Sequence, residues 1–93
     1  EIAAAVSGLF GLRLEGGRLS PERIEVPAGR RIKLILRNEG PGPMEFESLN
    51  PRIEKVLAAG GTSFVVLPPL KPGTYTFIDE FHAETGAMQV IAK

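Results

Sequence analysis

The chain contains no cysteine and no tryptophan, and His82 is the single histidine among its 93 residues. The lack of cysteine excludes disulfide bonds, thiolate zinc sites and blue copper centres, which need a thiolate ligand. With 11 basic and 11 acidic residues the formal net charge is zero, which gives no support to binding of nucleic acid or an anionic membrane surface. No apolar run reaches the ~20 residues that span a bilayer. No Ser-His-Asp set, phosphate-binding glycine loop or paired zinc motif is found, which argues against a hydrolytic enzyme.

The length and composition predict one small folded domain over residues 1–93. A hydrophobic fraction of 43% suits a globular chain, and 11 glycines with 8 prolines indicate many turns and short strands. Residues 1–8 are small and apolar. They are either a signal or linker remnant of an exported, processed protein or the frayed lead-in to a first strand.

Alternation of apolar and polar residues predicts about seven short strands, at most one short helix, and an all-β fold. The strands are expected over 9–15, 22–26, 32–38, 44–48 and 62–67, then after the Pro72-Gly73 turn as far as Asp79, and from 86 onwards. Asn50-Pro51 is expected to cap a helical turn over 52–55. The predicted architecture is a two-sheet antiparallel Greek-key β-sandwich. Its expected core consists of Leu12, Leu14, Ile24, Val26, Ile32, Leu34, Leu36, Phe46, Val65, Tyr75, Phe77 and Val90.

The stretch from Lys71 to Ile91 carries the main functional signal. Tyr75, Phe77 and Asp79 share one face of a predicted strand, and His82 follows three residues after Asp79. A carboxylate on a core-facing position is costly to bury unless something pairs with it. A bonded partner for Asp79 is therefore expected.

Acidic residues are concentrated in two segments, 38–51 and 72–92, which contain no lysine or arginine. These segments contribute Glu39, Glu45, Glu47, Asp79, Glu80 and Glu84. Like charges packed together raise one another's pKa unless a cation neutralises them. Two interpretations follow, a metal site and a solvated acidic rim.

Four motifs in order resemble the cupredoxins, a family of small copper-binding β-sandwiches. They are PERIEVPAG at 21–29, RNEG at 37–40, LKPGTY at 70–75, and YTFID at 75–79 followed by His82. Within the family, the EFES, EKV and Asp79–His82 segments look most like the cupredoxin-like domains of bacterial periplasmic iron uptake, of the Efe and Ftr type.

The resemblance implies a metal site with an altered ligand set. Asp79 falls where the cysteine would be, His82 falls at the ligand histidine, and Met44 takes the place of the first histidine. Glu45 matches a glutamate of the iron-uptake group, Glu84 falls near the axial methionine, and Glu84 with Glu47 could complete a second, looser site.

Each of these assignments has a simpler alternative. Asp79 could be bonded to loop amides, His82 could be a satisfied surface residue, and Met44 could be a core methionine. Met88, on the last strand, is expected in the core.

The predicted function is thus a periplasmic protein that binds copper, iron or both without a blue copper centre. It would assist ferrous iron oxidation, or deliver iron to a membrane permease or another periplasmic partner. The alternative is a metal-free cupredoxin-like domain that serves as a structural or protein-interaction module.

Overall fold

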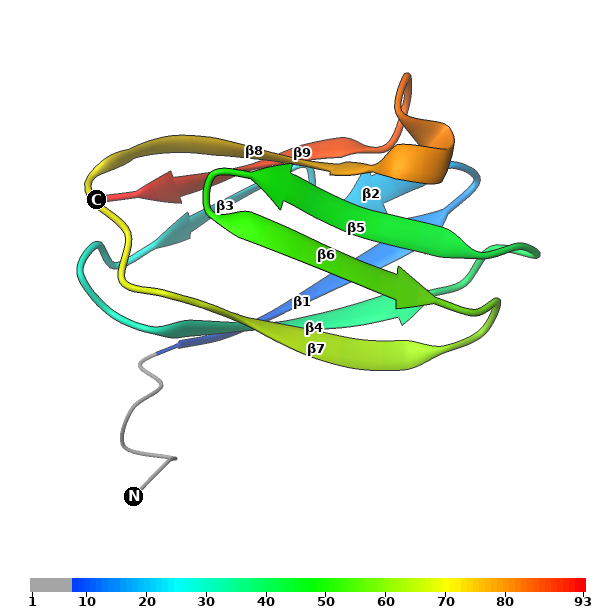
Figure 1. Ribbon diagram of the computed structural model, residues 1–93, viewed down its shortest axis with the longest axis horizontal. Helices are drawn as coiled ribbons and strands as arrows, with labels where there is room; N and C mark the ends of the chain where they lie inside the picture. The colour runs from blue at the N-terminus through cyan, green and yellow to red at the C-terminus, as the bar shows by residue number, and fades with distance from the viewer. Residues whose placement is uncertain (1–7) are drawn as a thin grey trace.

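A computed structural model describes residues 8–93, which form a two-layer β-sandwich (Figure 1). Interpretations of residues 1–7 lie outside the described part. The elements are β1 Gly8–Glu15, β2 Arg18–Ser20, β3 Arg23–Val26, β4 Ile32–Asn38, β5 Met44–Leu49, β6 Arg52–Leu57, β7 Thr62–Leu67, β8 Gly73–Asp79, the 3-10 turn η2 Glu80–His82, and β9 Ala87–Ala92. Within residues 8–93, no helix is both long enough and apolar enough to cross a membrane.

The two sheets have the strand orders β2-β1-β4-β7 and β3-β9-β8-β5-β6. The predicted all-β, two-sheet sandwich is therefore confirmed. Two details differ from the expected seven or so antiparallel strands. The described residues form nine strands, and both sheets contain parallel as well as antiparallel pairs. β1 runs parallel to β4, and β3 runs parallel to β9, while the other pairs are antiparallel. These parallel pairs join segments that are distant in sequence. No short turn connects them, so the sequence gives no indication of whether they run parallel or antiparallel.

The prediction of a helical turn over 52–55 is wrong, because these residues are the first four of strand β6. Leu49 pairs with Arg52, so Asn50 and Pro51 form the tight turn of a β5–β6 hairpin. Asn-Pro suits such a turn as well as it suits a helix start, and cross-strand pairing decides between them. Strand β2 was not expected, because three residues are too few to show alternation.

The core prediction is confirmed for eleven of its twelve residues, because these eleven are buried. Tyr75 is only partly buried, and its hydroxyl donates to the Lys71 carbonyl oxygen at 2.7 Å. At the centre, the rings of Phe46 and Phe77 stack with centroids 5.1 Å apart, which ties β5 to β8. Met88, also expected in the core, is buried, and the buried hydrophobic residues that were not expected there are Leu19, Met44, Leu57, Leu67, Leu70 and Ala92.

Candidate metal site

Asp79 is the last residue of β8 and is completely buried. One carboxylate oxygen, Oδ1, accepts hydrogen bonds from the backbone N–H of Glu45 at 2.9 Å and of Phe81 at 3.1 Å. The other oxygen, Oδ2, lies 2.5 Å from Nδ1 of His82. The expected partner of the buried carboxylate is therefore present, and it consists of one imidazole and two amides from β5 and η2.

The loop after β8 is shaped so that His82 turns back onto Asp79. Asp79 caps η2 through its bond to Phe81, and the carbonyl oxygen of His82 accepts from Thr85 N–H at 3.1 Å and Gly86 N–H at 2.7 Å. A Cβ at Gly86 would lie 3.0 Å from the Cβ of Asp79, so a larger residue would push the carboxylate from its place. Position 86 therefore requires glycine, because the backbone there passes close to the Asp79 side chain.

The imidazole of His82 is held at its Nδ1 side and remains accessible elsewhere. Its side chain is 41% exposed, and it packs against the β1–β2 turn, where a Cβ on Gly17 would lie 3.3 Å from the imidazole Cδ2. The Thr85 hydroxyl donates to the Gly17 carbonyl oxygen and fixes the loop to the same turn. Because Nδ1 faces Asp79, the second ring nitrogen, Nε2, is the atom left to bind a ligand.

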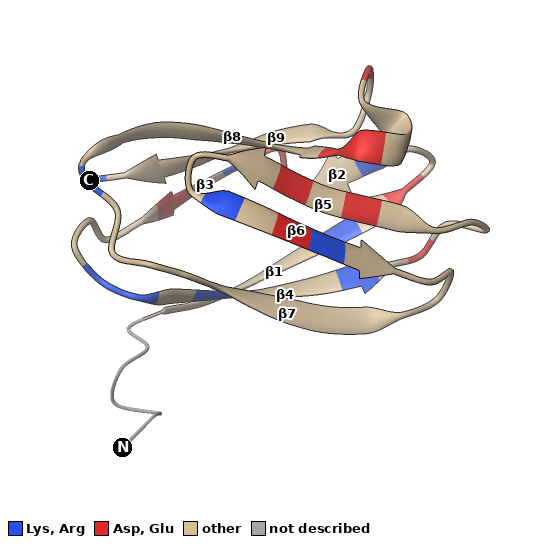
Figure 2. Ribbon diagram, in the orientation of Figure 1, with Lys and Arg blue, Asp and Glu red and all other residues tan. Residues whose placement is uncertain are grey.

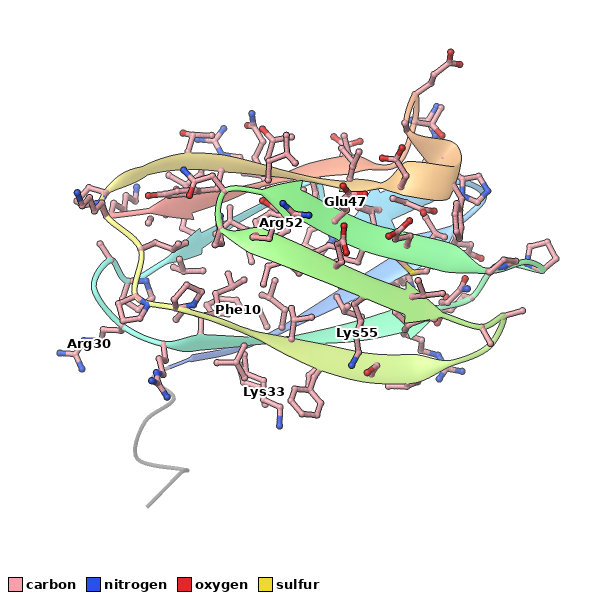
Figure 3. The ribbon with its side chains drawn as sticks, viewed as in Figure 1. Phe10, Arg30, Lys33, Glu47, Arg52 and Lys55 are labelled. Carbon is pink, nitrogen blue, oxygen red and sulfur yellow. The ribbon has the colours of Figure 1, made fainter. Side chains whose placement is uncertain are left out.

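A second group of side chains lies on the outer face of the same sheet. Met44 and Phe46 of β5 point into the core, so Glu45 and Glu47 point outward, and Glu54 of β6 lies directly opposite Glu47. One carboxylate oxygen from each of these three glutamates lies within 4.8 Å of the others. Figure 2 shows acidic segments on β5, β6 and η2, and Figure 3 shows Glu47 on the outside of β5.

Glu47 is the electrostatic centre of this outer group. Partial burial raises its pKa above the ordinary value of 4.5, and the charges of Glu80, Glu45 and Glu54 raise it further, as does a hydrogen bond with the Glu80 side chain. Arg52 reaches Glu54 at 3.8 Å, but both side chains are well exposed, so this pair contributes little. The group therefore carries repulsion that a bound cation would relieve.

This raised pKa predicts a pH dependence of stability. A carboxyl whose pKa is higher in the folded state stabilises the fold below its unfolded pKa, and this contribution is lost as pH rises through the folded pKa. The free energy of unfolding of the parent minus that of Glu47→Gln should therefore fall as pH rises from about the ordinary glutamate value of 4.5. Urea unfolding across this range measures it, with the exposed Glu22→Gln as a matched control. A difference for Glu47→Gln that does not change with pH would contradict the electrostatic account.

The residues expected to form one site are thus divided between two places. Asp79 is buried on the inner side with the partly exposed His82 bonded to it, whereas Glu45 and Glu47 lie on the outer face. Met44 is 1% exposed and lies in the hydrophobic core, where the simpler alternative placed it.

The expected convergence of six acids is only partial. Glu45, Glu47 and Glu80 come together, but Glu39 pairs with Arg37 at 3.2 Å, and Glu84 is exposed in the loop after η2. Glu54 was missed because it was placed in a helical turn. The signal that could have found it is the β5–β6 hairpin, in which an outward residue on one strand faces an outward residue on the other.

Comparison with known proteins agrees with this fold and identifies the family. The chain belongs to the cupredoxin-like domain family, whose sequence profile matches residues 3–92. It is 32% identical over 74 residues to an uncharacterized protein of Rickettsia prowazekii (strain Madrid E), a match that covers 80% of this chain and 59% of that protein's length.

Solved structures share the fold at low sequence identity. Auracyanin B superposes with a TM-score of 0.82 at 14% identity, covering 95% of this chain and 90% of that one. Auracyanin from Roseiflexus castenholzii gives 0.75 at 14% identity, with 95% and 98% covered. The metal-binding domain of the Cu(I)-exporting P-type ATPase CopA of Streptococcus pneumoniae D39 gives 0.77 at 11% identity, with 91% and 84% covered.

Proposed function

We propose that this cupredoxin-like domain binds a metal ion, Cu(II) or iron, at the end of the sandwich formed by β5, β8 and η2. The observation that carries the proposal is the orientation of His82, whose Nδ1 is bonded to the buried carboxylate of Asp79. Metal-binding histidines commonly use one ring nitrogen for the metal and the other for a carboxylate that fixes the ring. This bond supports Nε2 of His82 as the principal ligand atom, with Asp79 holding the opposite side of the ring.

The donors available suit an ion of intermediate or hard character. Imidazole binds copper and iron, and carboxylate oxygens suit iron and Cu(II). Glu45, Glu47 and Glu54, with Glu80 beside them, form the second, looser position for a cation. The exposed Glu84 would contribute at the rim of the first position, while Met44 would need to leave the core to bind.

The role that we propose for this ion is in iron uptake in the periplasm. The support is the resemblance of the EFES, EKV and Asp79–His82 segments to cupredoxin-like domains of Efe and Ftr type. Iron would be the cargo, and the domain would hold it for oxidation or for transfer to a membrane permease or another periplasmic protein. Carboxylates on an exposed face suit transfer, because an ion there can exchange with an approaching partner without opening the core.

A Cu(II)-loaded form should show no intense blue absorption. That band arises from charge transfer between a cysteine thiolate and Cu(II), and the chain has no cysteine. At the position of the ligand cysteine the chain has Asp79, whose oxygens already accept three protein hydrogen bonds. Visible absorption spectra of the protein titrated with Cu(II) test this, and a strong blue band would overturn the ligand assignment.

Calorimetric titration of the purified protein with Cu(II), Fe(II) and Fe(III) tests the proposal as a whole. Saturable binding of one of these ions, with release of protons from the ligands, is expected. A control protein with both His82→Ala and Glu47→Gln should lose this heat signal. Absence of saturable binding by the parent would end the metal-binding proposal.

A second candidate function is supported by the hydrogen bonds of Asp79. Two backbone N–H groups and one imidazole satisfy its buried oxygens without any ion, so the pair can close this end of the sandwich by itself. Under this alternative the domain is a metal-free structural or interaction module. The same titration separates the two candidates.

A further inference from the structure

Two neighbouring strands of the five-stranded sheet, β5 and β8, diverge over most of their length. Within residues 8–93 they pair only at Phe46 with Asp79 and at Glu47 with Ile78. On its other side, β8 pairs with β9 from Gly73 to Ile78. The edge of β8 between Gly73 and Phe77 therefore has no strand beside it on the β5 side, and alternate residues direct N–H and C=O groups to this side.

A cleft of about 470 Å³ fills the space between the diverging strands. Thr74 and Thr76 line it on β8, and Ser48 and Leu49 line it on β5. The free edge of β8 covers five residues, which corresponds to roughly 16 Å at the usual rise of a strand. The cleft thus combines an open hydrogen-bonding edge with the length of a short extended peptide.

The serine in this cleft lacks the partner that a buried hydroxyl normally has. Ser48 is 3% exposed, and its Oγ makes no hydrogen bond to any residue in the range 8–93. Buried polar groups are nearly always hydrogen-bonded, so an unpaired one calls for an explanation. Ser48 follows Met44 and Phe46 on the buried side of β5, so this unpaired hydroxyl lies at the inner margin of the cleft.

Charge at the narrow end of the cleft indicates which ligand fits. The strands converge at Glu47 and Ile78, and both Glu47 and Glu80 line the cleft there. Two carboxylates therefore lie at this end of the cleft and give it negative charge. A lysine or arginine side chain placed between them would neutralise this charge.

We propose that an extended segment of a partner protein, carrying a lysine or arginine, binds in this cleft as an added strand on the free edge of β8. Its backbone pairs with the edge between Gly73 and Phe77, and its basic side chain lies between Glu47 and Glu80. This mode is β-strand addition, in which main-chain hydrogen bonds give affinity and side-chain pockets give specificity. It requires no metal and does not involve His82.

The probes are two blocked pentapeptides of alternating threonine and valine, one with lysine at its second position and one with lysine at its fourth. In either strand direction one of them places lysine opposite Thr76, on the same outer side of the sheet as Glu47. Each is titrated into the isotope-labelled protein in the presence of a chelator, and amide shifts are followed by NMR. We expect saturable shifts at Thr74, Thr76 and Ser48, the residues that line the cleft. Absence of shifts along the β8 edge at millimolar peptide would overturn the proposal.

Two matched comparisons test the parts of the proposal separately. A peptide N-methylated at alternate residues cannot pair with the edge, so it should bind at least tenfold more weakly. The double variant Glu47→Gln with Glu80→Gln should bind the lysine peptide at least tenfold more weakly, yet bind the same peptide with glutamine in place of lysine as the parent does. Glu22→Gln, before β3, should change neither affinity. Equal binding of the methylated peptide would exclude strand addition, and equal binding of the lysine peptide by the double variant would exclude the charge assignment.

Discussion

Replacing Asp79 by alanine should lower the free energy of unfolding of the metal-free protein by roughly 3 kcal/mol, since buried donors left without an acceptor cost about 1–3 kcal/mol each. The carboxylate accepts from two backbone amides, of Glu45 and Phe81, and from His82. The imidazole is 41% exposed, so water can replace its bond, and the loss falls mainly on the two amides. Urea unfolding with a chelator present measures the change. Because a small domain is stable by only about 5–15 kcal/mol, a loss of this size should be readily measurable in the unfolding curve.

Two further variants identify which bonds matter. Asp79→Asn keeps an oxygen for the two amides and removes the charge that faces His82, so it should cost less than alanine. Glu84→Ala changes an exposed acid in the adjacent loop and should alter stability by about 0.5 kcal/mol at most. If Asp79→Ala costs no more than Glu84→Ala, these hydrogen bonds do not hold β5 to the η2 loop.

Local patterns in the sequence predicted much of the strand layout. The spans 32–38 and 62–67 coincide with β4 and β7, because side chains that alternate between core and solvent leave a period of two in the sequence. The same period placed Phe77 and Asp79 on one inner face. The cost of burying a carboxylate predicted a bonded partner for Asp79, and the family resemblance placed His82 at the same site, but their direct bond was not predicted.

Features that depend on pairing between distant segments were not predictable in this way. The amide of Glu45 that bonds Asp79 is 34 residues away in sequence, and only the fold brings them together. Glu54 joins Glu45 and Glu47 through the register of the β5–β6 hairpin, which a single change in turn type would shift. By contrast, the division of Met44 and Glu45 between two faces of one sheet follows from local alternation alone, and the sequence already indicated it.

Removing the histidine should have the largest effect on metal binding. His82→Ala should weaken binding of Cu(II) by well over tenfold, which corresponds to more than ~1.4 kcal/mol of binding free energy. The reason is that it removes the imidazole that Asp79 orients through Nδ1. A ligand imidazole must be unprotonated to bind, so the affinity of the parent for Cu(II) should fall on acidification, and this dependence should be reduced in the variant. Calorimetric titration at several pH values gives both quantities.

Matched variants decide where the ion binds. Glu15→Ala removes an exposed acid at the end of β1 and should leave the affinity for Cu(II) unchanged. Glu45→Gln with Glu47→Gln removes two of the three outer carboxylates and should affect only the looser position. If His82→Ala binds as the parent does while the glutamine pair does not, the outer face is the main site. If neither changes the affinity, ion binding is unrelated to this end of the sandwich. The metal-free module then becomes the better account, because the bonds of Asp79 are complete without an ion.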